Sequence, residues 1–378
     1  MRTTTAREVH KAQCCSMTAF CENSVILRKI PASAGIFLYN NMFERILRKA
    51  AEKYGFTAEE HRMVQEFTRQ LQDEISKIFI GKEEQIRLMT AAVFCGGHVL
   101  LDDLPGTGKT TLVRTMSKAL GCTFQRVQFT PDLLPSDIIG MTIYDQKTGD
   151  FRQIEGPVFT NILLADEINR AIPRTQSALL EAMEEGQVTI DRQTHVLPEP
   201  FIVLATQNPV EEESTFALPA AQKDRFFMKL TLGYPDAAQE AKILENLGDG
   251  TDFTRVEAVG SPQKLGKIRQ EIQNVHVSAY MRDYIIALIQ ATREAETLTM
   301  GASARGSRSL YQGAKAIAAI EGRDYVIPED IQCLYVPVIS HRLVVRRRAA
   351  AAARTAEEIL QEILQKTSVP PDAKESLS

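Results

Sequence analysis

Several features that mark membrane, metal-binding and nucleic-acid-binding proteins are missing from this sequence of 378 residues. No run of about 18 apolar residues occurs, so no helix is expected to span a membrane. The six cysteines form no C-x-x-C pair and the six histidines no H-x-x-x-H pair, which argues against a transition-metal site or a redox disulfide. The net charge of −4 argues against a dedicated nucleic-acid binder. We therefore expect a cytoplasmic protein with reduced thiols.

What is present is the composition of an ordinary globular chain, 44% hydrophobic and 24% charged, with a length that suits two domains. Four short runs rich in Val, Ile, Leu and Phe alternate with helical patterns, which predicts an α/β fold with a parallel sheet covered on both faces. These runs are HVLLD (98–102), FQRVQF (124–129), NILLAD (161–166) and FIVLAT (201–206). After residue 236 helical periodicity dominates, so an all-helical domain is predicted to follow.

These changes of pattern divide the chain into four parts. We assign residues 57–234 to the α/β domain and residues 235–368 to the smaller helical domain. Residues 1–56 are expected to be an N-terminal extension that is disordered in part, and residues 369–378 a flexible tail. A targeting segment at the N-terminus is the alternative, although this stretch has neither a sustained apolar core nor a clear cleavage site.

Two hairpins are predicted to project from the sheet without extending it. The segment MTIYDQKTGDFRQIEG is expected to turn at residues 147–150, and the segment QVTIDRQTHVL at residues 191–194. Short alternating stretches flank both turns, which is typical of paired strands.

The segment LDDLPGTGKT (101–110) supplies what a phosphate-binding loop needs: backbone N–H groups, a lysine for the outer phosphates and a hydroxyl for Mg²⁺. Asp103 stands where the usual pattern has its first glycine, but an apolar strand precedes the loop and a helical pattern follows it. The residues expected to bind the nucleotide are Pro105, Gly106, Thr107, Gly108, Lys109, Thr110 and Thr111, with Thr110 also a ligand of Mg²⁺. The alternative is a glycine turn with an incidental lysine.

Two carboxylates and an amide come directly after two of the apolar runs. Asp166 and Glu167 end the run NILLAD, and Asn208 follows the run FIVLAT. Parallel strands deliver such groups to one edge of a sheet. Asp166 is expected to bind the nucleotide and to hold Mg²⁺ through water, Glu167 to polarise the attacking water, and Asn208 to contact that water and the γ-phosphate. The alternatives are a strand that simply ends in solvent and an Asn-Pro turn.

Two arginines are candidates for stabilising the charge that phosphoryl transfer spreads over the phosphate oxygens. Arg225, in QKDRFF, stands just before the last strand-like stretch of the α/β domain and is expected to act from a neighbouring subunit. Arg305, in GASARGSR, stands at the start of a helix of the second domain, where it could close on the same nucleotide. Surface salt bridges are the alternative for both.

From roughly residue 60 to residue 365 the chain resembles the MoxR family of AAA+ ATPases. The resemblance rests on HVLLDDLPGTGKT, QFTPDLLPSDIIG, GPVFTNILLADEINRAIPRTQSALLEAMEEGQVTI, LPEPFIVLATQNPVEEESTFALPAAQKDRF, and GRDYVIPEDI followed by HRL. That family writes an acidic pair before the Pro-Gly of its loop, which fits Asp103. The sequence departs slightly from the family's pattern in two places. One is residues 214–226, in a loop near the subunit interface, and the other is Ala304, just before Arg305.

The resemblance implies an AAA+ P-loop αβα core with a five-stranded sheet, a helical lid, and ATP with Mg²⁺ bound between the subunits of a homo-oligomeric ring, usually a hexamer. It implies that Arg225 is the family's arginine finger and Arg305 the arginine of its second sensor. It also implies that both hairpins face the pore of the ring or the substrate. It also implies a chaperone-like protein that matures or activates metalloenzymes and other complexes, commonly with a partner that has a von Willebrand factor A domain.

We therefore expect an ATPase that remodels protein complexes. The main alternative is a nucleic-acid-linked AAA+ motor, but the sequence has no zinc motif, no helix-turn-helix signature and no platform of aromatic and basic residues. A nucleotide-dependent binding scaffold is a third hypothesis, and the presence of Asp166, Glu167 and Asn208 argues against it.

Overall fold

The computed structural model of the protein describes residues 58–147, 149–208, 216–246, 253–346 and 354–369. The expected N-terminal extension at 1–56 lies outside these residues, and so does all but the first residue of the expected tail at 369–378. From Glu59 onward the described residues belong to one structural unit, in which the central sheet and the helices that follow it share contacts.

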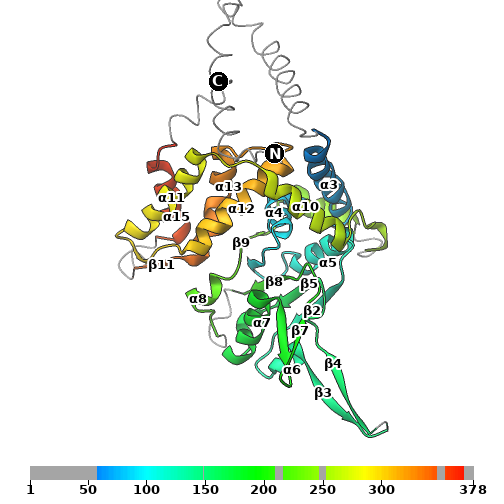
Figure 1. Ribbon diagram of the computed structural model, residues 1–378. Coiled ribbons are helices and arrows are strands. Elements are labelled where there is room, and N and C mark those ends of the chain that lie inside the picture. Colours follow the sequence, from blue (N-terminus) through cyan, green and yellow to red (C-terminus); the bar gives the residue numbers. More distant parts are fainter. Residues whose placement is uncertain (1–57, 148, 209–215, 247–252, 347–353, 370–378) are drawn as a thin grey trace, which may run out of the picture. The chain divides into compact units, whose positions relative to one another are not determined.

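A five-stranded parallel sheet, in the order β2-β5-β8-β1-β9, forms the centre of the α/β part (Figure 1). Its strands are β1 (Val99–Asp102), β2 (Phe124–Gln128), β5 (Ile162–Asp166), β8 (Ile202–Gln207) and β9 (Met228–Leu230). Every neighbouring pair is parallel. The four predicted strands are confirmed, and β9 is the strand-like stretch expected after Arg225.

Alternate residues of the central strands pack into two separate hydrophobic cores, one on each face of the sheet. Leu164 and Leu204 belong to the first core, whereas their neighbours Leu163 and Val203 belong to the second. The first core includes α3 (Ala58–Ser76), α4 (Glu83–Phe94) and α5 (Lys109–Ala119), and the second includes α6 (Pro135–Ile139) and α7 (Pro173–Glu185). Because both faces are buried, β5 and β8 have uninterrupted apolar runs, and the αβα arrangement is confirmed.

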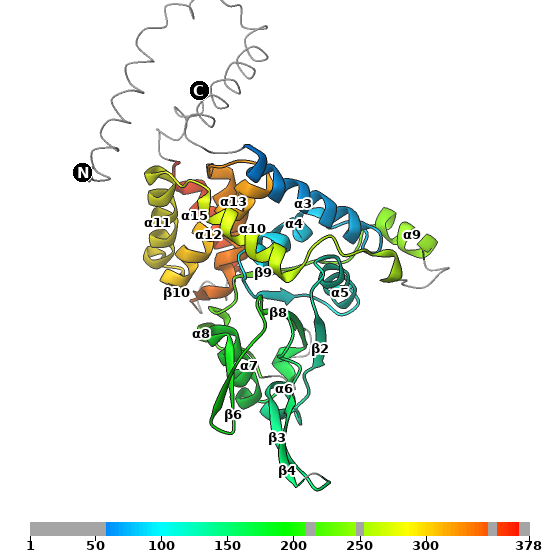
Figure 2. The same ribbon diagram turned by 45° about the vertical axis from the view of Figure 1, so that its right-hand side comes forward.

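The helices after β9 form the lid, and all of them except α9 continue the first core, with α12 packed against α4 (Figure 2). They are α9 (Ala237–Asn246), α10 (Pro262–Asn274), α11 (Ala279–Glu294), α12 (Ala304–Ile320), α13 (Pro328–Ile339) and α15 (Ala356–Lys366). Four of them begin after a residue whose side chain accepts a backbone N–H of the first turn, which stabilises the helix end. These caps are Ser261, Ser278, Ser303 and Thr355.

The prediction that the second domain is all-helical is wrong in one detail. β10 (Leu298–Met300) and β11 (Val344–Val345) form a short antiparallel pair within it. Strands of two or three residues are too short for an alternating pattern to be recognised. Other short elements are α8 (Ala220–Lys223) and the 3₁₀ turns Ile168–Arg170, Phe253–Arg255 and Ser340–Arg342.

Both predicted hairpins are present as separate antiparallel sheets. The first pairs β3 (Gly140–Asp145) with β4 (Asp150–Glu155) and extends away from the central sheet in Figure 1, and the second pairs β6 (Gln187–Ile190) with β7 (Gln193–Val196). The second turn is tighter than predicted, because Gln193 and Thr194 already belong to β7. Asp191 and Arg192 connect the strands with φ values of 48° and 69°. Positive φ at both positions matches the twist of the paired strands.

Candidate functional site

The predicted phosphate-binding loop connects β1 to α5 at the carboxyl edge of the sheet. Gly106 and Gly108 have φ values of 81° and 80°, a backbone region that favours glycine, and Gly108 immediately precedes α5. A Cβ atom on Gly108 would lie 3.0 Å from the ring of Phe79, so this position is also crowded. The loop therefore leads straight into a helix N-terminus, where unpaired N–H groups can bind phosphate.

The side chain of Lys109 is bonded within the loop. Its Nζ atom donates to the backbone carbonyls of Asp103, at 2.8 Å, and Leu104, at 2.7 Å. Burial lowers the pKa of Lys109, although the nearby charges of Asp103, Asp166 and Glu167 raise it. An anionic phosphate forms a stronger hydrogen bond than a carbonyl, so a phosphate entering the loop would compete for this ammonium group.

Asp103, which departs from the usual loop pattern, has a structural role that glycine could not fill. Its side chain is buried, with 4% of the residue exposed. One carboxylate oxygen accepts the N–H of Leu104 at 2.9 Å, and the other accepts the N–H groups of Leu232 at 2.9 Å and Gly233 at 3.0 Å. Asp103 thus connects the start of the loop to the chain that leaves β9 towards the lid.

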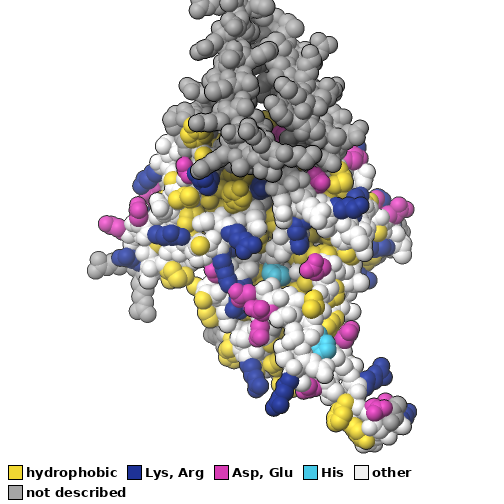
Figure 3. All heavy atoms as spheres, viewed as in Figure 1, with side chains coloured by type: hydrophobic (Ala, Val, Ile, Leu, Met, Phe, Trp, Pro, Cys, Tyr) yellow, Lys and Arg dark blue, Asp and Glu magenta, His cyan; other side chains and the backbone are white. Residues whose placement is uncertain are grey.

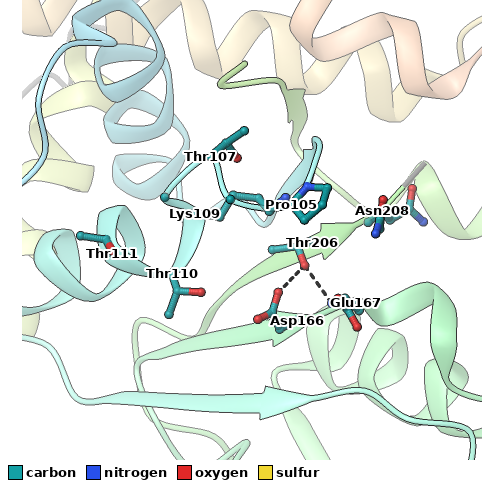
Figure 4. A pocket seen from close by; sticks show the side chains of 12 residues that line it. Pro105, Thr107, Lys109, Thr110, Thr111, Asp166, Glu167, Thr206 and Asn208 are labelled. Carbon is teal, nitrogen blue, oxygen red and sulfur yellow. Dashed lines mark hydrogen bonds between the residues drawn. The ribbon is translucent and has the colours of Figure 1, made fainter. Parts of the chain in front are cut away.

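Thr206 connects the two predicted carboxylates, as the dashed lines in Figure 4 show. Its hydroxyl donates to Oδ1 of Asp166 at 2.6 Å and accepts the backbone N–H of Glu167 at 2.8 Å. Glu167 has a φ of 57°, in the left-handed region that is uncommon for residues other than glycine. Such a backbone persists where its surroundings hold it in place, which is common at functional sites.

Three further side chains hold the same carboxylates. Arg126 donates to Oδ2 of Asp166 through Nη2 at 2.6 Å and Nε at 3.1 Å. Gln128 and Arg170 donate to Oε2 of Glu167 at 2.8 Å and 3.0 Å. Both carboxylates are therefore oriented by groups from β2, β8 and the 3₁₀ turn after β5.

No role is predicted from the sequence for Thr206, Arg126 or Gln128. A signal was present, because Arg126 and Gln128 occupy alternate positions of β2 and so lie on one face of it. Strand β2 pairs with β5 in a register that places Gln128 opposite Asp166. Polar residues with this spacing beside a strand that ends in carboxylates indicate contacts to those carboxylates.

One cavity of about 360 Å³ brings together the loop and the residues that end β5 and β8 (Figure 4). Its lining comprises Pro105, Gly106, Thr107, Gly108, Lys109, Thr110, Thr111, Asp166, Glu167, Thr206, Gln207 and Asn208. Asn169 donates to the backbone carbonyl of Asn208 at 3.3 Å, next to the pocket. All the residues predicted to bind the nucleotide, together with Glu167 and Asn208, therefore share one pocket; their roles stay predictions.

The two predicted arginines lie in a second cavity, of about 450 Å³, together with residues 95–98. Those residues precede β1, whereas the loop follows it, so this cavity lies at the amino edge of the sheet. The four residues of β1 span about 13 Å between the two edges. Arg225 and Arg305 thus lie beside each other and away from the phosphate-binding loop of their own chain.

Comparisons with known proteins agree with this architecture. Residues 98–228 match the model of the ATPase family associated with various cellular activities (AAA), and residues 290–363 match the model of the AAA lid domain. Chaperone MoxR1 of Mycobacterium tuberculosis is 40% identical over 306 residues, which cover 79% of this chain and 81% of that protein. The chain belongs to the MoxR family of AAA+ ATPases.

Other relatives cover a similar part of this MoxR chain. The uncharacterised protein YeaC of Bacillus subtilis is 45% identical over 298 residues, or 79% of this chain and 93% of that protein. Protein MoxR of Paracoccus denitrificans is 34% identical over 293 residues, or 71% and 86%. A crystal structure of a candidate ATPase from Cytophaga hutchinsonii has a TM-score of 0.78 and 40% identity, and the match covers 86% of this chain and 99% of that one.

Two kinds of feature are absent from the described part of the MoxR chain. None of its helices there is both long and apolar enough to cross a membrane. The same residues contain no group of three or more His, Cys, Asp or Glu side chains placed to hold a metal ion.

Proposed function

We propose that this MoxR-family protein hydrolyses ATP in a Mg²⁺-dependent reaction in the cytoplasm and uses the energy to remodel or activate protein complexes. The observation that carries the proposal is the single pocket in which the loop, Asp166, Glu167 and Asn208 meet. The chaperone-like character of the MoxR family supports the second half of the proposal. The thiols of Cys95, Cys122 and Cys333 are unpaired in the described chain, which suits a reducing compartment.

The loop binds the phosphates of ATP, and Lys109 exchanges the carbonyls of Asp103 and Leu104 for phosphate oxygens. The hydroxyl of Thr110 and the carboxylate of Asp166 are oxygen donors on the wall of the same pocket, and oxygen is the ligand that Mg²⁺ prefers. When bound with ATP, Mg²⁺ would neutralise part of the phosphate charge.

Glu167 is the group that polarises the attacking water. Gln128 and Arg170 both bind its Oε2, so the carboxylate is held in one orientation while it does so. Asn208, at the end of the adjacent strand β8, positions the water and the γ-phosphate relative to each other. A pre-oriented base and a positioned water together reduce the reorganisation needed at the moment of reaction.

The positions of Arg225 and Arg305 support a site shared between subunits. Both residues lie at the amino edge of the sheet, about 13 Å of strand away from the loop of their own chain. A ring that brings the amino edge of one copy against the loop of the next would bring both arginines to the neighbour's ATP. We propose such a ring, with six copies, which is the usual number implied by the resemblance to the MoxR family of AAA+ ATPases.

The hairpin β3–β4 supports a contact with a client protein. Tyr144 and Phe151 pair across its outer end with ring centroids 5.4 Å apart, and 56% and 77% of their surfaces are exposed. Exposed aromatic pairs at the end of a projecting element are typical of protein-binding surfaces. Hydrolysis would move these hairpins relative to the client as the ring changes its arrangement.

The first experiment measures ATP turnover and nucleotide affinity of the assembled protein, with and without EDTA. Glu167→Gln should bind ATP as the wild type does and lose about 100-fold or more in turnover, because it cannot accept a proton. Lys109→Ala should lose binding, and Glu185→Gln, on the surface of α7, is the matched control and should match the wild type. Wild-type turnover in Glu167→Gln, or in EDTA, would contradict the proposal.

A second experiment identifies the client. Tagged Glu167→Gln should hold ATP and retain its client, whereas Lys109→Ala should not. Recovery with Glu167→Gln alone of a protein with a von Willebrand factor A domain, or of a metalloenzyme subunit, would support the chaperone proposal. Recovery of nucleic acid, together with ATPase activity that DNA stimulates and salt suppresses, would favour the nucleic-acid motor instead.

A further inference from the structure

The cavity at the amino edge has more positive than negative charge. Four arginines line it, together with the carboxylates of Glu184 and Asp224. The arginines are Arg225, Arg305, Arg308 and Arg342. In Figure 3, basic side chains in dark blue and acidic ones in magenta gather on the face between the lid helices and α7. A surface of this charge suits an anion supplied from outside the chain.

Glu184, at the end of α7, binds the two predicted catalytic arginines at once. Its Oε2 atom lies 2.8 Å from Nε of Arg225, and its Oε1 atom accepts a hydrogen bond from Nη2 of Arg305. Each arginine therefore has its own carboxylate oxygen. A guanidinium carries five N–H donors, so these contacts leave donors on both arginines for phosphate oxygens.

A second carboxylate, that of Asp224, connects the two backbone segments on which Arg225 and Arg305 lie. Asp224 precedes Arg225 and accepts hydrogen bonds from the hydroxyl of Ser303, at 2.9 and 3.0 Å. Ser303 is the cap of α12, two residues before Arg305. Asp224 also accepts a bond from Arg342 at 2.8 Å, so the end of α8 and the start of α12 are fixed to each other.

The charges explain why the two arginines need a carboxylate between them. Burial and, to a smaller extent, the positive charge of Arg305 lower the pKa of Arg342 to about 10, against the opposing effect of Asp224. Arg225 and Arg305 contact the same carboxylate, so their guanidinium groups also lie close enough to repel each other. Without Glu184, repulsion would separate the side chains of Arg225 and Arg305, since Asp224 restrains their backbones and not their guanidinium groups.

We infer that Glu184 is a positioning residue that holds Arg225 and Arg305 together as one phosphate-binding unit for the ATP of the neighbouring subunit. The inference rests on the proposed function, in which both arginines act across a subunit interface. Glu184 acts through the arginines and does not touch the nucleotide. Replacing Glu184 should therefore lower the catalytic rate at the neighbour's site and leave the nucleotide affinity of its own chain unchanged.

The test compares Glu184→Gln with Glu185→Gln, the adjacent carboxylate of α7, which takes no part in these contacts. At saturating ATP, kcat of Glu184→Gln should fall about tenfold or more, because misplaced groups lose much of their catalytic effect. The Kd for a fluorescent ATP analogue should not change in either variant. If Glu184→Gln does not fold or assemble, Glu184→Asp replaces it, since it keeps the charge and is too short to reach both arginines.

Mixed rings separate a positioning role from a structural one. Lys109→Ala has no functional loop but keeps Glu184 and both arginines, so mixing it with Glu184→Gln should restore turnover at the intact loops of the Glu184→Gln subunits. Arg225→Ala mixed with Lys109→Ala is the reference, because it tests the shared site alone. Restoration in both mixtures supports the inference.

Two outcomes would overturn the inference while leaving the proposed function intact. One is a Glu184→Gln protein with wild-type kcat when Arg225→Ala is inactive. The other is restored turnover in the Arg225→Ala mixture but not in the Glu184→Gln mixture, which would make Glu184 necessary within its own subunit. A fully active Arg225→Ala protein would instead contradict the shared site itself.

Discussion

His98 shows how a single buried side chain can fix three elements of the α/β domain. The backbone N–H of Val203 in β8 donates to its Nδ1, so Nε2 carries the ring proton and donates to the carbonyl of Met183 in α7, both at 3.0 Å. Burial lowers the pKa of His98 to about 4, although the bond to Met183 raises it. A second proton on the ring would break the contact with Val203.

We therefore expect acid to destabilise the protein through His98. An unfolded histidine binds a proton below pH 6.5 and the folded one only near pH 4, so its stabilising contribution is complete above pH 6.5 and is lost as the pH falls towards 4. Between pH 7.5 and 5.0 this loss should be about 2 kcal/mol. Urea unfolding at both pH values measures the free energy of unfolding. Between these pH values it should fall by about 2 kcal/mol less in His98→Gln than in the wild type.

The control for this measurement is His276→Gln, which replaces an exposed histidine and should behave as the wild type does. The folding free energies are compared as differences between the two pH values, so a general destabilisation by His98→Gln cancels. An equal loss of stability in the wild type and in His98→Gln would show that His98 is not responsible.

At the scale of elements, a strand or helix can be predicted when its own sequence contains the full pattern of apolar residues that identifies it. β5 and β8 are buried along their full length, so each had to be an apolar run that is visible without its neighbours. β10 and β11 have three and two residues, and their pairing depends on residues 44 positions or more from each other, such as Met300 and Val344. Pairings of this kind leave no local pattern.

The candidate site also has some residues that a local sequence pattern predicts and some contacts that no local pattern predicts. The loop, Asp166, Glu167 and Asn208 could be predicted because each follows an apolar strand, and parallel strands bring such groups to one edge. The partners of Asp103 could not, since Leu232 and Gly233 are 129 and 130 residues away in the sequence. The same holds for contacts between the α/β domain and the lid, such as the packing of α12 against α4, the packing of α13 against β9, and the hydrogen bond from Ser303 to Asp224.

Two glycines in lid helices test this packing. Gly266 in α10 has nothing within 4 Å of an added Cβ, so Gly266→Ala should stabilise the protein by about 0.5–1 kcal/mol through the lower entropy of the unfolded chain. Gly313 in α12 would place a Cβ 2.9 Å from the buried side chain of Leu334 in α13. Gly313→Ala should therefore destabilise by about 1–3 kcal/mol.

Thermal unfolding of the nucleotide-free protein measures both effects. Each variant is the control for the other, because both make the same change inside a helix and differ in the space around it. Stabilisation by Gly313→Ala equal to that of Gly266→Ala would mean that the contact between α12 and α13 is looser than the structure has it.

At the scale of the whole molecule, the groups expected to act on one ATP lie at opposite edges of one sheet. The loop pocket contains Asp166 and Glu167, whereas the cavity at the amino edge contains Arg225 and Arg305. Neither cavity has the full set of groups that phosphoryl transfer uses. A single subunit should therefore bind ATP and hydrolyse it slowly, and turnover per subunit should rise with protein concentration as copies assemble.

The most direct test of this account measures turnover and nucleotide affinity of Arg225→Ala at a concentration where the wild type is assembled. We expect a loss of about 10³-fold or more in kcat, as for other arginines that reach a phosphate across an interface, with an unchanged Kd for ATP. Arg282→Ala, on the exposed surface of α11, is the matched control and should retain full activity. Wild-type turnover in Arg225→Ala would contradict the account, because the subunit would then contain a complete site by itself.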